Sequence, residues 1–474
     1  MLEGLEISEV ILSQLEYSGR LDSEYYRPEC LKLEHLLRGR NSTKLGCIAD
    51  FLIGPFGSAF TVDNYTADRT YRYIRGKDVK PMRLMDDDNV YMPVADFDRL
   101  SKYALRKGDI LISVVGTTGN AAIVKSDDLP AVFSCKSTVT RVRGVDAHYL
   151  LTYLNTKFGQ LLLRRKERGA VQMGLNLDDL KTLDVYDAGS DFQEAVAGVY
   201  KKTVSIEKSS KRIFAEAELL LLDILGLKKY APEWQSVNIK SFKNSFVSTG
   251  RLDAEHYQPK YDQLHQALIE YPGGTTTVGE LAGDIANGAE VREYQETGTP
   301  YLRVGDLKFL DIEGSSVVNI DPVSAASGLE KIGLQTGDVL LSRSGSLAVS
   351  AVVESAWEKA LISSHLIRLR IVDARLDPYF LALFFMTLPG KMQIQKWSNG
   401  GVQPEISQPA VKAIVVPIPP MAVQLKIRDL ILTARQLRTH STSLLNAAKR
   451  AVEIAIEQNE AAGMACLTLE GATT

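Results

Sequence analysis

The sequence contains an internal repeat with an offset of about 231 residues. Gly19–Pro28 reads GRLDSEYYRP, and GRLDAEHYQP returns at Gly250–Pro259. Each repeat unit is much longer than the 20 to 50 residues of a solenoid repeat. The chain is therefore predicted to be a tandem duplication of a complete domain. Three further strings recur with near-constant offsets: Tyr73–Arg75 with Tyr301–Arg303, Gly108–Ser113 with Gly337–Ser342, and Gly169–Gln172 with Gly400–Gln403.

Each repeat ends in a long segment with heptad spacing. Steps of three and four residues alternate over Val196–Ile224 and again over Ile427–Ala455, which is the spacing of a helix with one packed seam. Ser190 and Gln193 form a predicted capping box for the first helix, and Gly226 ends it. Both seams contain Ala and Ser, which allow close backbone approach, so we expect the helices to pair as a coiled coil. The alternative is that each helix separately covers a sheet.

Outside the two long helices, short β-branched strands alternate with glycine and proline turns and with helical segments. The predicted fold is therefore α/β, with two similar domains separated by two long antiparallel coiled-coil helices in a pseudo-two-fold arrangement. The predicted boundaries are a lead-in at 1–18, a first domain at 19–189, a long helix and linker at 190–234, a second domain at 235–420, a second long helix at 421–460 and a tail at 461–474.

The composition is that of a folded protein. With 474 residues and 45% apolar content, the chain is long enough for two or three domains. We expect a soluble protein, because no apolar run approaches a membrane span and the N-terminus lacks the basic start of a signal peptide. The four cysteines form no CxxC pair, so we expect neither disulfides nor a zinc site, and a cytoplasmic location. The net charge of −3 does not exclude a polyanionic partner, since local patches decide such binding.

The sequence contains no recognisable catalytic motif. The six histidines have no HxxxH or HExxH spacing, and GxSxG is absent. The glycine-rich turn Gly116–Asn120 follows a predicted strand, but it matches neither phosphate-loop pattern and no helix is predicted after it. Asp377–Phe380 is similar to the Asn/Asp-Pro-Pro-Tyr string of amino-methyltransferases but lacks the second proline. It is therefore predicted to be the start of a helix. We therefore predict a chain with no catalytic residue and no metal site.

Two clusters of basic and amide side chains lie at the same place in the two repeats. Cationic side chains bind phosphates. The amides of glutamine and asparagine form paired hydrogen bonds with adenine, and arginine does so with guanine. A basic helix end is ordinarily a solvated face, but its recurrence favours nucleic acid. Arg75 and Arg303 are equally compatible with structural ion pairs to Asp78 and Asp306. The candidate DNA-binding residues are Arg164, Arg165, Lys166, Arg168 and Gln172 in the first repeat, and Arg343, Lys391, Lys396, Trp397, Ser398, Asn399 and Gln403 in the second.

Several of these strings resemble the specificity subunits of type I restriction-modification systems. The strings are the paired segments 108–124 and 337–353, the run 400–420, and the long helix led by Gln424. The duplicated layout carries the resemblance over nearly the whole chain. It implies two target-recognition domains held apart by two antiparallel helices, with each domain reading one half of a bipartite, asymmetric DNA target. The first copy departs from the pattern, because Asp187–Ser190 replaces the Pro-Ile-Pro-Pro end of the second copy.

The resemblance also implies a set of partners. The helices are expected to dock two DNA methyltransferase subunits, and restriction or translocase subunits complete such complexes. This chain is then a non-catalytic recognition subunit without a cofactor of its own, while S-adenosylmethionine, ATP and Mg belong to the partner subunits. Two alternatives remain open: an enzyme of unknown type whose duplicated domains surround a cleft, and a protein-interaction scaffold.

Overall fold

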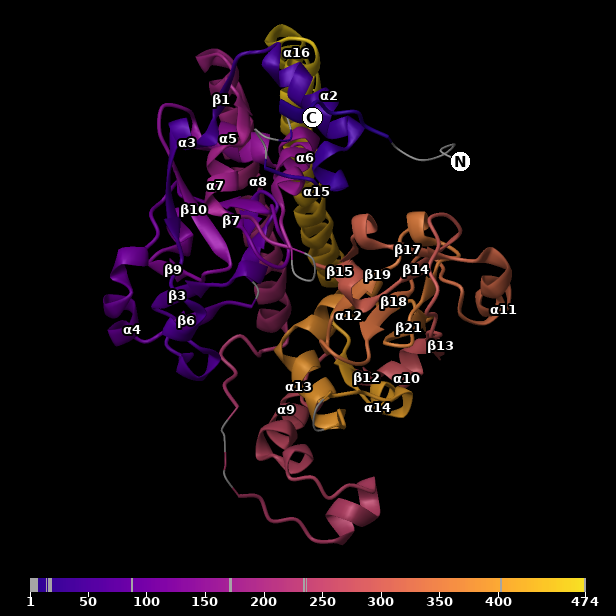
Figure 1. Cartoon of the computed structure of the whole chain (residues 1–474). Coiled ribbons are helices and arrows are strands. Elements are labelled where there is room, and N and C mark those ends of the chain that lie inside the picture. Colours follow the sequence, from indigo (N-terminus) through magenta and orange to yellow (C-terminus); the bar gives the residue numbers. More distant parts are fainter. Residues whose placement is uncertain are drawn as a thin grey trace. The chain divides into compact units, whose positions relative to one another are not determined.

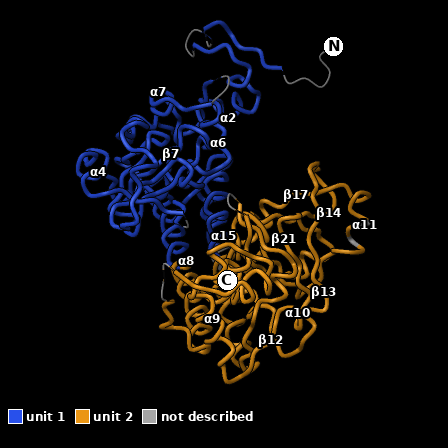
Figure 2. Tube along the Cα trace, turned by 90° about the horizontal axis from the view of Figure 1, so that it is seen from below, with its two compact units in different colours: residues 1–205, 440–474 blue, residues 206–439 orange. Residues whose placement is uncertain are grey.

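The computed structural model describes residues 7–472 apart from 14, 16–18, 87, 170–172, 233–234, 236 and 401–402. The chain divides into two compact units, coloured separately in Figure 2: residues 1–205 with 440–474 form unit 1, and residues 206–439 form unit 2. Both units combine helices and small sheets, as predicted for an α/β protein (Figure 1). Two long helices, α8 (Ser190–Ile224) and α15 (Met421–Glu457), contribute to both units.

Unit 1 is built around a four-stranded antiparallel sheet with the order β2-β10-β7-β8. Its strands are β2 (Ala49–Ile53), β10 (Ser137–Val142), β7 (Ile110–Ser113) and β8 (Ala121–Ile123). A second sheet has the order β6-β3-β9 and contains a parallel pair, β3 with β9. Its strands are β6 (Val90–Met92), β3 (Tyr71–Ile74) and β9 (Ala131–Phe133). Two strand pairs complete the unit: β1 (Ser42–Lys44) with β11 (Asp184–Tyr186), and β4 (Val79–Lys80) with β5 (Arg83–Leu84).

Unit 2 has the same types of sheet in the same chain order. Its four-stranded antiparallel sheet has the order β13-β21-β18-β19, with β13 (Ala282–Asn287), β21 (Leu366–Ile371), β18 (Val339–Ser342) and β19 (Ser350–Val352). The sheet β17-β14-β20 again contains a parallel pair, β14 (Thr299–Leu302) with β20 (Leu361–Ile362), beside β17 (Val318–Ile320). The remaining pairs are β12 (Thr275–Thr277) with β22 (Val415–Pro417), and β15 (Leu307–Lys308) with β16 (Asp311–Ile312).

Apart from α16, the shorter helices of the two units also recur in corresponding positions. In unit 1 they are α2 (Pro28–Arg38), α3 (Leu45–Ile48), α4 (Val94–Arg99), α5 (Ala147–Leu154), α6 (Lys157–Lys166), α7 (Leu177–Lys181) and α16 (Glu460–Ala472). In unit 2 they are α9 (Pro259–Ile269), α10 (Val278–Leu281), α11 (Pro322–Ile332), α12 (Pro378–Met386), α13 (Leu388–Trp397) and α14 (Gln408–Lys412). Helix α16 lies in the segment for which the sequence predicts only a tail.

The central strand β7 is buried on both faces, which explains its continuous apolar sequence. Because side chains alternate along a strand, Ile110 and Ile112 enter one core while Leu111 enters another on the opposite face. In unit 2, Val339 and Leu341 likewise enter one core and Leu340 the other. The four-stranded sheet of each unit is therefore the middle layer of an α/β fold.

The sequence pattern over 148–166 predicts a single helix, but the structure has two helices there, α5 and α6. Thr156 separates them, because its Oγ1 accepts a hydrogen bond from the backbone N–H of Gly159 at 3.0 Å and so caps α6. A β-carbon at Gly159 would lie 2.2 Å from the carbonyl oxygen of Tyr153. The glycine therefore permits the close turn, and the next helix begins on a new axis.

Parts of both long helices lie in the core of each unit. In unit 1, Val196 of α8 and Ala448 of α15 belong to the same apolar cluster. In unit 2, Ala217 of α8 and Ile427 of α15 do so. The buried surface of α8 is wider than the predicted seam, since off-seam side chains such as Tyr200 are also buried. In each unit, α8 and α15 therefore pack against the domain and also share its core with one another.

Within the described residues, no helix is both long enough and apolar enough to cross a membrane.

Candidate nucleic-acid interface

The two predicted polar loops are closed in the same way. In unit 1, the N–H of Arg168 donates to the carbonyl of Gly174 at 2.9 Å, and the reciprocal bond is 2.8 Å. In unit 2, Asn399 and Glu405 form the same reciprocal pair at 2.8 and 2.7 Å. Because the closing bonds are between backbone groups, the side chains along these loops are not needed to hold the loop ends together.

Each loop is attached to the turn that follows the central strand. The N–H of Leu175 donates to the carbonyl of Val114 at 3.0 Å, and the N–H of Ile406 donates to the carbonyl of Arg343 at 2.9 Å. The polar loop and the hairpin turn of each unit are therefore neighbours.

The repeated GRLD string anchors the start of each loop. In unit 1, Arg20 donates to the carbonyls of Arg165 and Glu167 at 3.3 and 2.9 Å. In unit 2, Arg251 donates to the carbonyls of Trp397 and Ser398 at 3.2 and 2.9 Å. These carbonyls belong to the last turns and C-caps of α6 and α13, where no intrahelical donor reaches them. The sequence showed that the string recurs but not what it binds.

The basic cluster of unit 1 is largely committed to internal contacts. Arg165 has only 7% of its side chain exposed, pairs with Glu34 at 2.9 Å, and lies over the Tyr25 ring with its guanidinium carbon 4.2 Å from the centroid. Burial lowers the pKa of Lys166, whose Nζ donates to Thr182 at 3.0 Å. Arg165 and Lys166 were predicted to bind phosphate, but their contacts within the domain give them a structural role.

Two members of the cluster reach the surface. Arg164 is exposed. Arg168 is half exposed, and it forms a two-bond ion pair with Asp179 at 2.7 and 2.8 Å. The hydrogen bonds to Asp179 raise the pKa of Arg168, and the pair holds its guanidinium beside the loop. The predicted reader Gln172 lies outside the described residues.

In unit 2 the amide side chains lie at the surface. Asn399 and Gln403 are exposed, as is Lys391. Arg343 forms an ion pair with Glu405 at the base of the loop. The amides of this unit are therefore accessible, whereas its arginine is held by a carboxylate.

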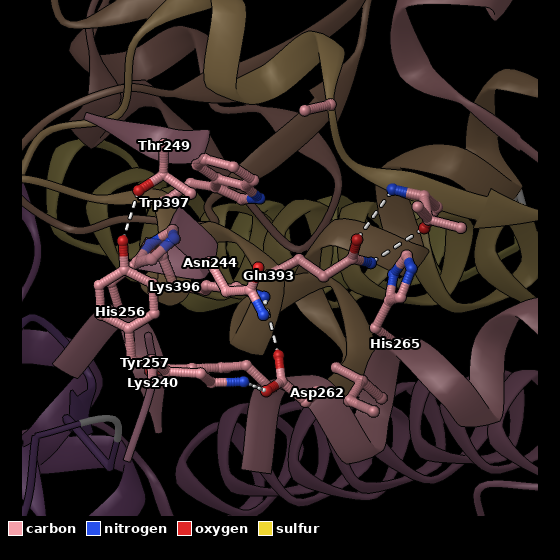
Figure 3. A pocket seen from close by; sticks show the side chains of 14 residues that line it. Lys240, Asn244, Thr249, His256, Tyr257, Asp262, His265, Gln393, Lys396 and Trp397 are labelled. Carbon is pink, nitrogen blue, oxygen red and sulfur yellow. Dashed lines mark hydrogen bonds and ion pairs between the residues drawn. The ribbon is translucent and has the colours of Figure 1, made fainter. Parts of the chain in front are cut away.

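Lys396 and Trp397 line a pocket of about 320 Å³ instead of extending from the loop (Figure 3). Asp262 pairs with Lys240 at 2.6 Å and with Lys396 at 3.6 Å, as the close-up shows. Burial lowers the pKa of Lys396. Trp397 packs edge to face on His256, with ring centroids 4.9 Å apart. Ser398 Oγ donates to the carbonyl of Gln395 at 2.9 Å.

Gln403 also lines a cleft of about 590 Å³ in unit 2. The sequence did not predict this cleft, because its members come from five separate segments of the chain. Besides Gln403, these segments contribute Glu290–Arg292 with Tyr294, Tyr301 with Arg303–Gly305, Ser344–Ser346, and Ser363–His365.

Arg75 and Arg303 differ in how firmly they are held. Arg75 bonds both carboxylate oxygens of Asp78, at 3.0 and 2.8 Å, so it is a structural ion pair. Arg303 approaches Asp306 only to 3.6 Å and is 37% exposed. The carboxylate of Asp306 instead accepts the backbone N–H of Arg303 at 2.7 Å. Arg303 is therefore the freer of the two guanidinium groups.

Other predicted structural roles agree with the geometry. Asp377 caps α12, where its carboxylate accepts the N–H of Tyr379 at 2.9 Å. Asp109 pairs with Arg141 at 3.1 Å, and Asp338 pairs with Arg370 at 2.9 Å. Among the described residues, no group of three His, Cys, Asp or Glu side chains is placed to hold a metal ion.

Comparison with known proteins gives one family match and several similar structures. Residues 282–441 match the type I restriction modification DNA specificity domain. A search of curated proteins gives no match. The S subunit of a type I restriction-modification system from M. genitalium is 12% identical, with a TM-score of 0.40, over 88% of this chain and 94% of that chain. The HsdS subunit from Thermoanaerobacter tengcongensis is 14% identical, with a TM-score of 0.26, over 90% and 96%.

Proposed function

Because this chain belongs to the DNA specificity subunits of type I restriction-modification systems, we propose that its two α/β domains each read one half of a bipartite, asymmetric DNA target. The match of residues 282–441 to the DNA specificity domain carries the proposal. The proposed domains are residues 19–189 and 235–420. Each contains a polar loop joined to a hairpin turn, and the two loops present different side chains. Different side chains read different base edges, so the two halves of the target differ.

We propose that the chain arose by tandem duplication and that α8 and α15 pair as an antiparallel coiled coil. The shared strand order of the two units and the paired GRLD anchors support duplication. Two hydrogen bonds support antiparallel pairing: Ser441 donates to the carbonyl of Thr203 at 3.5 Å in unit 1, and Ser210 donates to the carbonyl of Ala434 at 2.6 Å in unit 2. Later residues of α15 thus contact earlier residues of α8.

We propose that the exposed faces of these two helices dock two DNA methyltransferase subunits. Small residues such as Ala448 and Ala451 bring the helices close, and charged residues such as Lys201 and Lys202 remain on the exposed side. S-adenosylmethionine, ATP and Mg then act on the methyltransferase and restriction subunits, and this chain supplies recognition without catalysis.

The enzyme alternative has one observation in its favour. Ser344 and His365 form a hydroxyl–imidazole hydrogen bond, the contact that activates a nucleophile in hydrolases. Within the described residues no carboxylate contacts His365, so the third group that orients the base is missing. The contact fits a structural or DNA-binding role better than a catalytic one.

Co-purification of the chain with its methyltransferase partner, followed by sequencing of the modified bases, tests the proposal. A motif with two different halves is the expected result. Methylation or cleavage of DNA by the purified single chain would favour the enzyme. A complex without salt-dependent DNA binding would favour the scaffold, since phosphate contacts make DNA affinity fall with salt.

The loop of unit 2 gives the first residue-level prediction. Replacing Asn399 and Gln403 together with alanine is expected to reduce discrimination in one half-site by about 1–3 kcal/mol, because each amide can form a paired contact to a base. The fold should be unaffected, since the loop is closed by backbone bonds. Competition binding with duplexes altered in one half at a time measures the effect.

Gln395→Ala is the matched control, because Gln395 is an exposed amide on α13 just before the same loop. It should leave both half-sites unchanged. If the double variant keeps wild-type selectivity in both halves, the loop is not a reader.

A further inference from the structure

The cleft of about 590 Å³ in unit 2 lies at the carboxyl ends of two parallel strands. In the register of β14 and β20, Leu302 is opposite Ile362, so Arg303 and Ser363 leave the sheet side by side. The N–H of Ser363 donates to the carbonyl of Leu302 at 2.9 Å, which fixes the serine at the edge. Strand ends of this kind are where α/β folds commonly hold ligands.

Ser363 carries a buried polar group without a partner. The residue is only 5% exposed, and its Oγ has no hydrogen-bond partner among the described residues. Buried hydroxyls are nearly always hydrogen-bonded, because losing water without a replacement is costly. A ligand group entering the cleft would supply the missing partner.

The same unsatisfied hydroxyl occurs at the corresponding position of unit 1. Ser134 follows β9 as Ser363 follows β20, and its N–H donates to the carbonyl of Ile74 at 2.9 Å. It is 7% exposed, and its Oγ also lacks a partner within the described part of the chain. An accident of side-chain placement would not be expected to occur at both positions, so we take the open hydroxyl to be a feature of the domain.

The rim of the cleft carries cations and an aromatic ring. The guanidinium carbon of Arg303 lies 5.6 Å from the centroid of Tyr294, and Arg303 also donates to the carbonyl of Ser316. Arg292 is 84% exposed and pairs with Glu290 at 2.9 Å. An exposed ion pair contributes little stability, so Arg292 can exchange Glu290 for a phosphate at small cost.

Elsewhere the cleft is lined by neutral hydrogen-bonding groups. Ser344 is held by His365, and the neighbouring turn brings Gly345 against Gln403. A β-carbon at Gly345 would lie 3.8 Å from Nε2 of Gln403, and the glycine has a φ of +77°. Hydroxyls and an amide can match the donors and acceptors of a base edge, while arginines at the rim suit the backbone.

We propose that this cleft takes the edge of a DNA base, with Ser363 and Gln403 making the sequence-reading contacts and Arg292 and Arg303 holding adjacent phosphates. The inference rests on the proposed function and adds a reading site from strands β14 and β20 to the polar loop. Since glutamine pairs best with adenine, adenine is the base expected there.

Ser363→Ala is the sharpest test, because the hydroxyl has no bond in the protein to lose. The full chain is purified with its methyltransferase partner, and the wild-type motif is first read by sequencing the modified bases. Fluorescence anisotropy then compares duplexes that carry the motif or a single base change. The expected result is an unchanged melting temperature and at least about a fivefold loss of discrimination at one position of one half-site.

Three further variants separate the roles. Arg292→Ala should weaken binding to all sequences alike and reduce the slope of log affinity against log salt by about one. Ser350→Ala removes a buried hydroxyl that donates to the carbonyl of Leu340 at 2.7 Å, so it should lower stability and leave the motif unchanged. Ser134→Ala in unit 1 should leave the half-site that Ser363→Ala alters unchanged.

The outcomes distinguish the two proposals. If the wild-type complex shows no bipartite motif, the proposed function fails. If the motif is present but Ser363→Ala binds with wild-type selectivity, only the cleft proposal fails. A lower melting temperature for Ser363→Ala would also overturn it, because the hydroxyl would then have a structural role.

Discussion

Replacing Arg165 with alanine is expected to lower the free energy of unfolding by about 3 kcal/mol. Breaking a buried ion pair costs about 3–5 kcal/mol, because the remaining charge loses its partner. The lower end applies here, since Glu34 keeps a second ion pair with Arg38. The variant also loses the bond from Nε to the carbonyl of Tyr25 at 2.8 Å.

Arg164→Ala is the control for this prediction. Arg164 is adjacent in sequence and has the same charge, but it is exposed, so its loss should change stability by less than about 0.5 kcal/mol. Urea unfolding followed by far-ultraviolet circular dichroism measures both variants. Trp357 and Trp397 belong to unit 2, so a change in their fluorescence reports on that unit. Equal midpoints for both variants would show that Arg165 contributes no more than a surface cation.

The effect of Arg165→Ala should depend on pH. Burial alone would raise the pKa of Glu34, but Arg165 and Arg38 outweigh it and hold the pKa below its usual value of 4.5. A carboxylate with a lowered folded-state pKa stabilises the protein above its unfolded-state pKa and loses this contribution as the pH falls. The difference between wild type and variant should therefore be largest near neutral pH and shrink below about pH 4.5.

Much of the fold could be predicted from local patterns. The apolar run at 110–115 predicts a strand, and the structure has one at Ile110–Ser113. The spacing of Val196–Ile224 predicts a long helix, which is also present. The break at Thr156 was not predicted, because an apolar helical pattern continues across it. It depends on a cap and on the close approach of Gly159, neither of which changes the hydrophobic period.

The candidate site was harder to predict because burial decides which polar residues are available. Arg165 and Lys396 have the sequence context of surface cations, yet Glu34 and Asp262 hold them inside the domains. Their partners lie 131 and 134 residues away in the chain, so no local pattern connects them. Ser363 carries no sequence signal either. It stands out only once β14 and β20 are paired and its hydroxyl is found without a partner.

The two long helices are expected to act as a spacer between the half-sites. Helix α8 has 35 residues and α15 has 37, so each extends about 52–56 Å at 1.5 Å per residue. This length is ample for domains that bind one duplex turn apart, about 34 Å. Under the proposed antiparallel pairing, the helix length sets the gap between the two half-sites.

Inserting four residues after Ser205 in α8 and four after Thr439 in α15 should widen the preferred gap. Both positions are exposed and mark the division between the units along the helices. The insertion adds about 6 Å, which is one to two base-pair steps of 3.4 Å. Sequencing of modified sites should show both half-sequences unchanged around a longer gap.

Inserting residues into α8 alone is the control. It shifts one helix against the other on one side of the insertion, so the contacts Ser441–Thr203 and Ser210–Ala434 cannot both form, and stability should fall. The paired insertion keeps both ends of the seam in register and changes only the length between them. A stable paired-insertion variant that modifies sites with the original gap would refute the helices as the spacer, and the gap would then have to be set by the partner subunits.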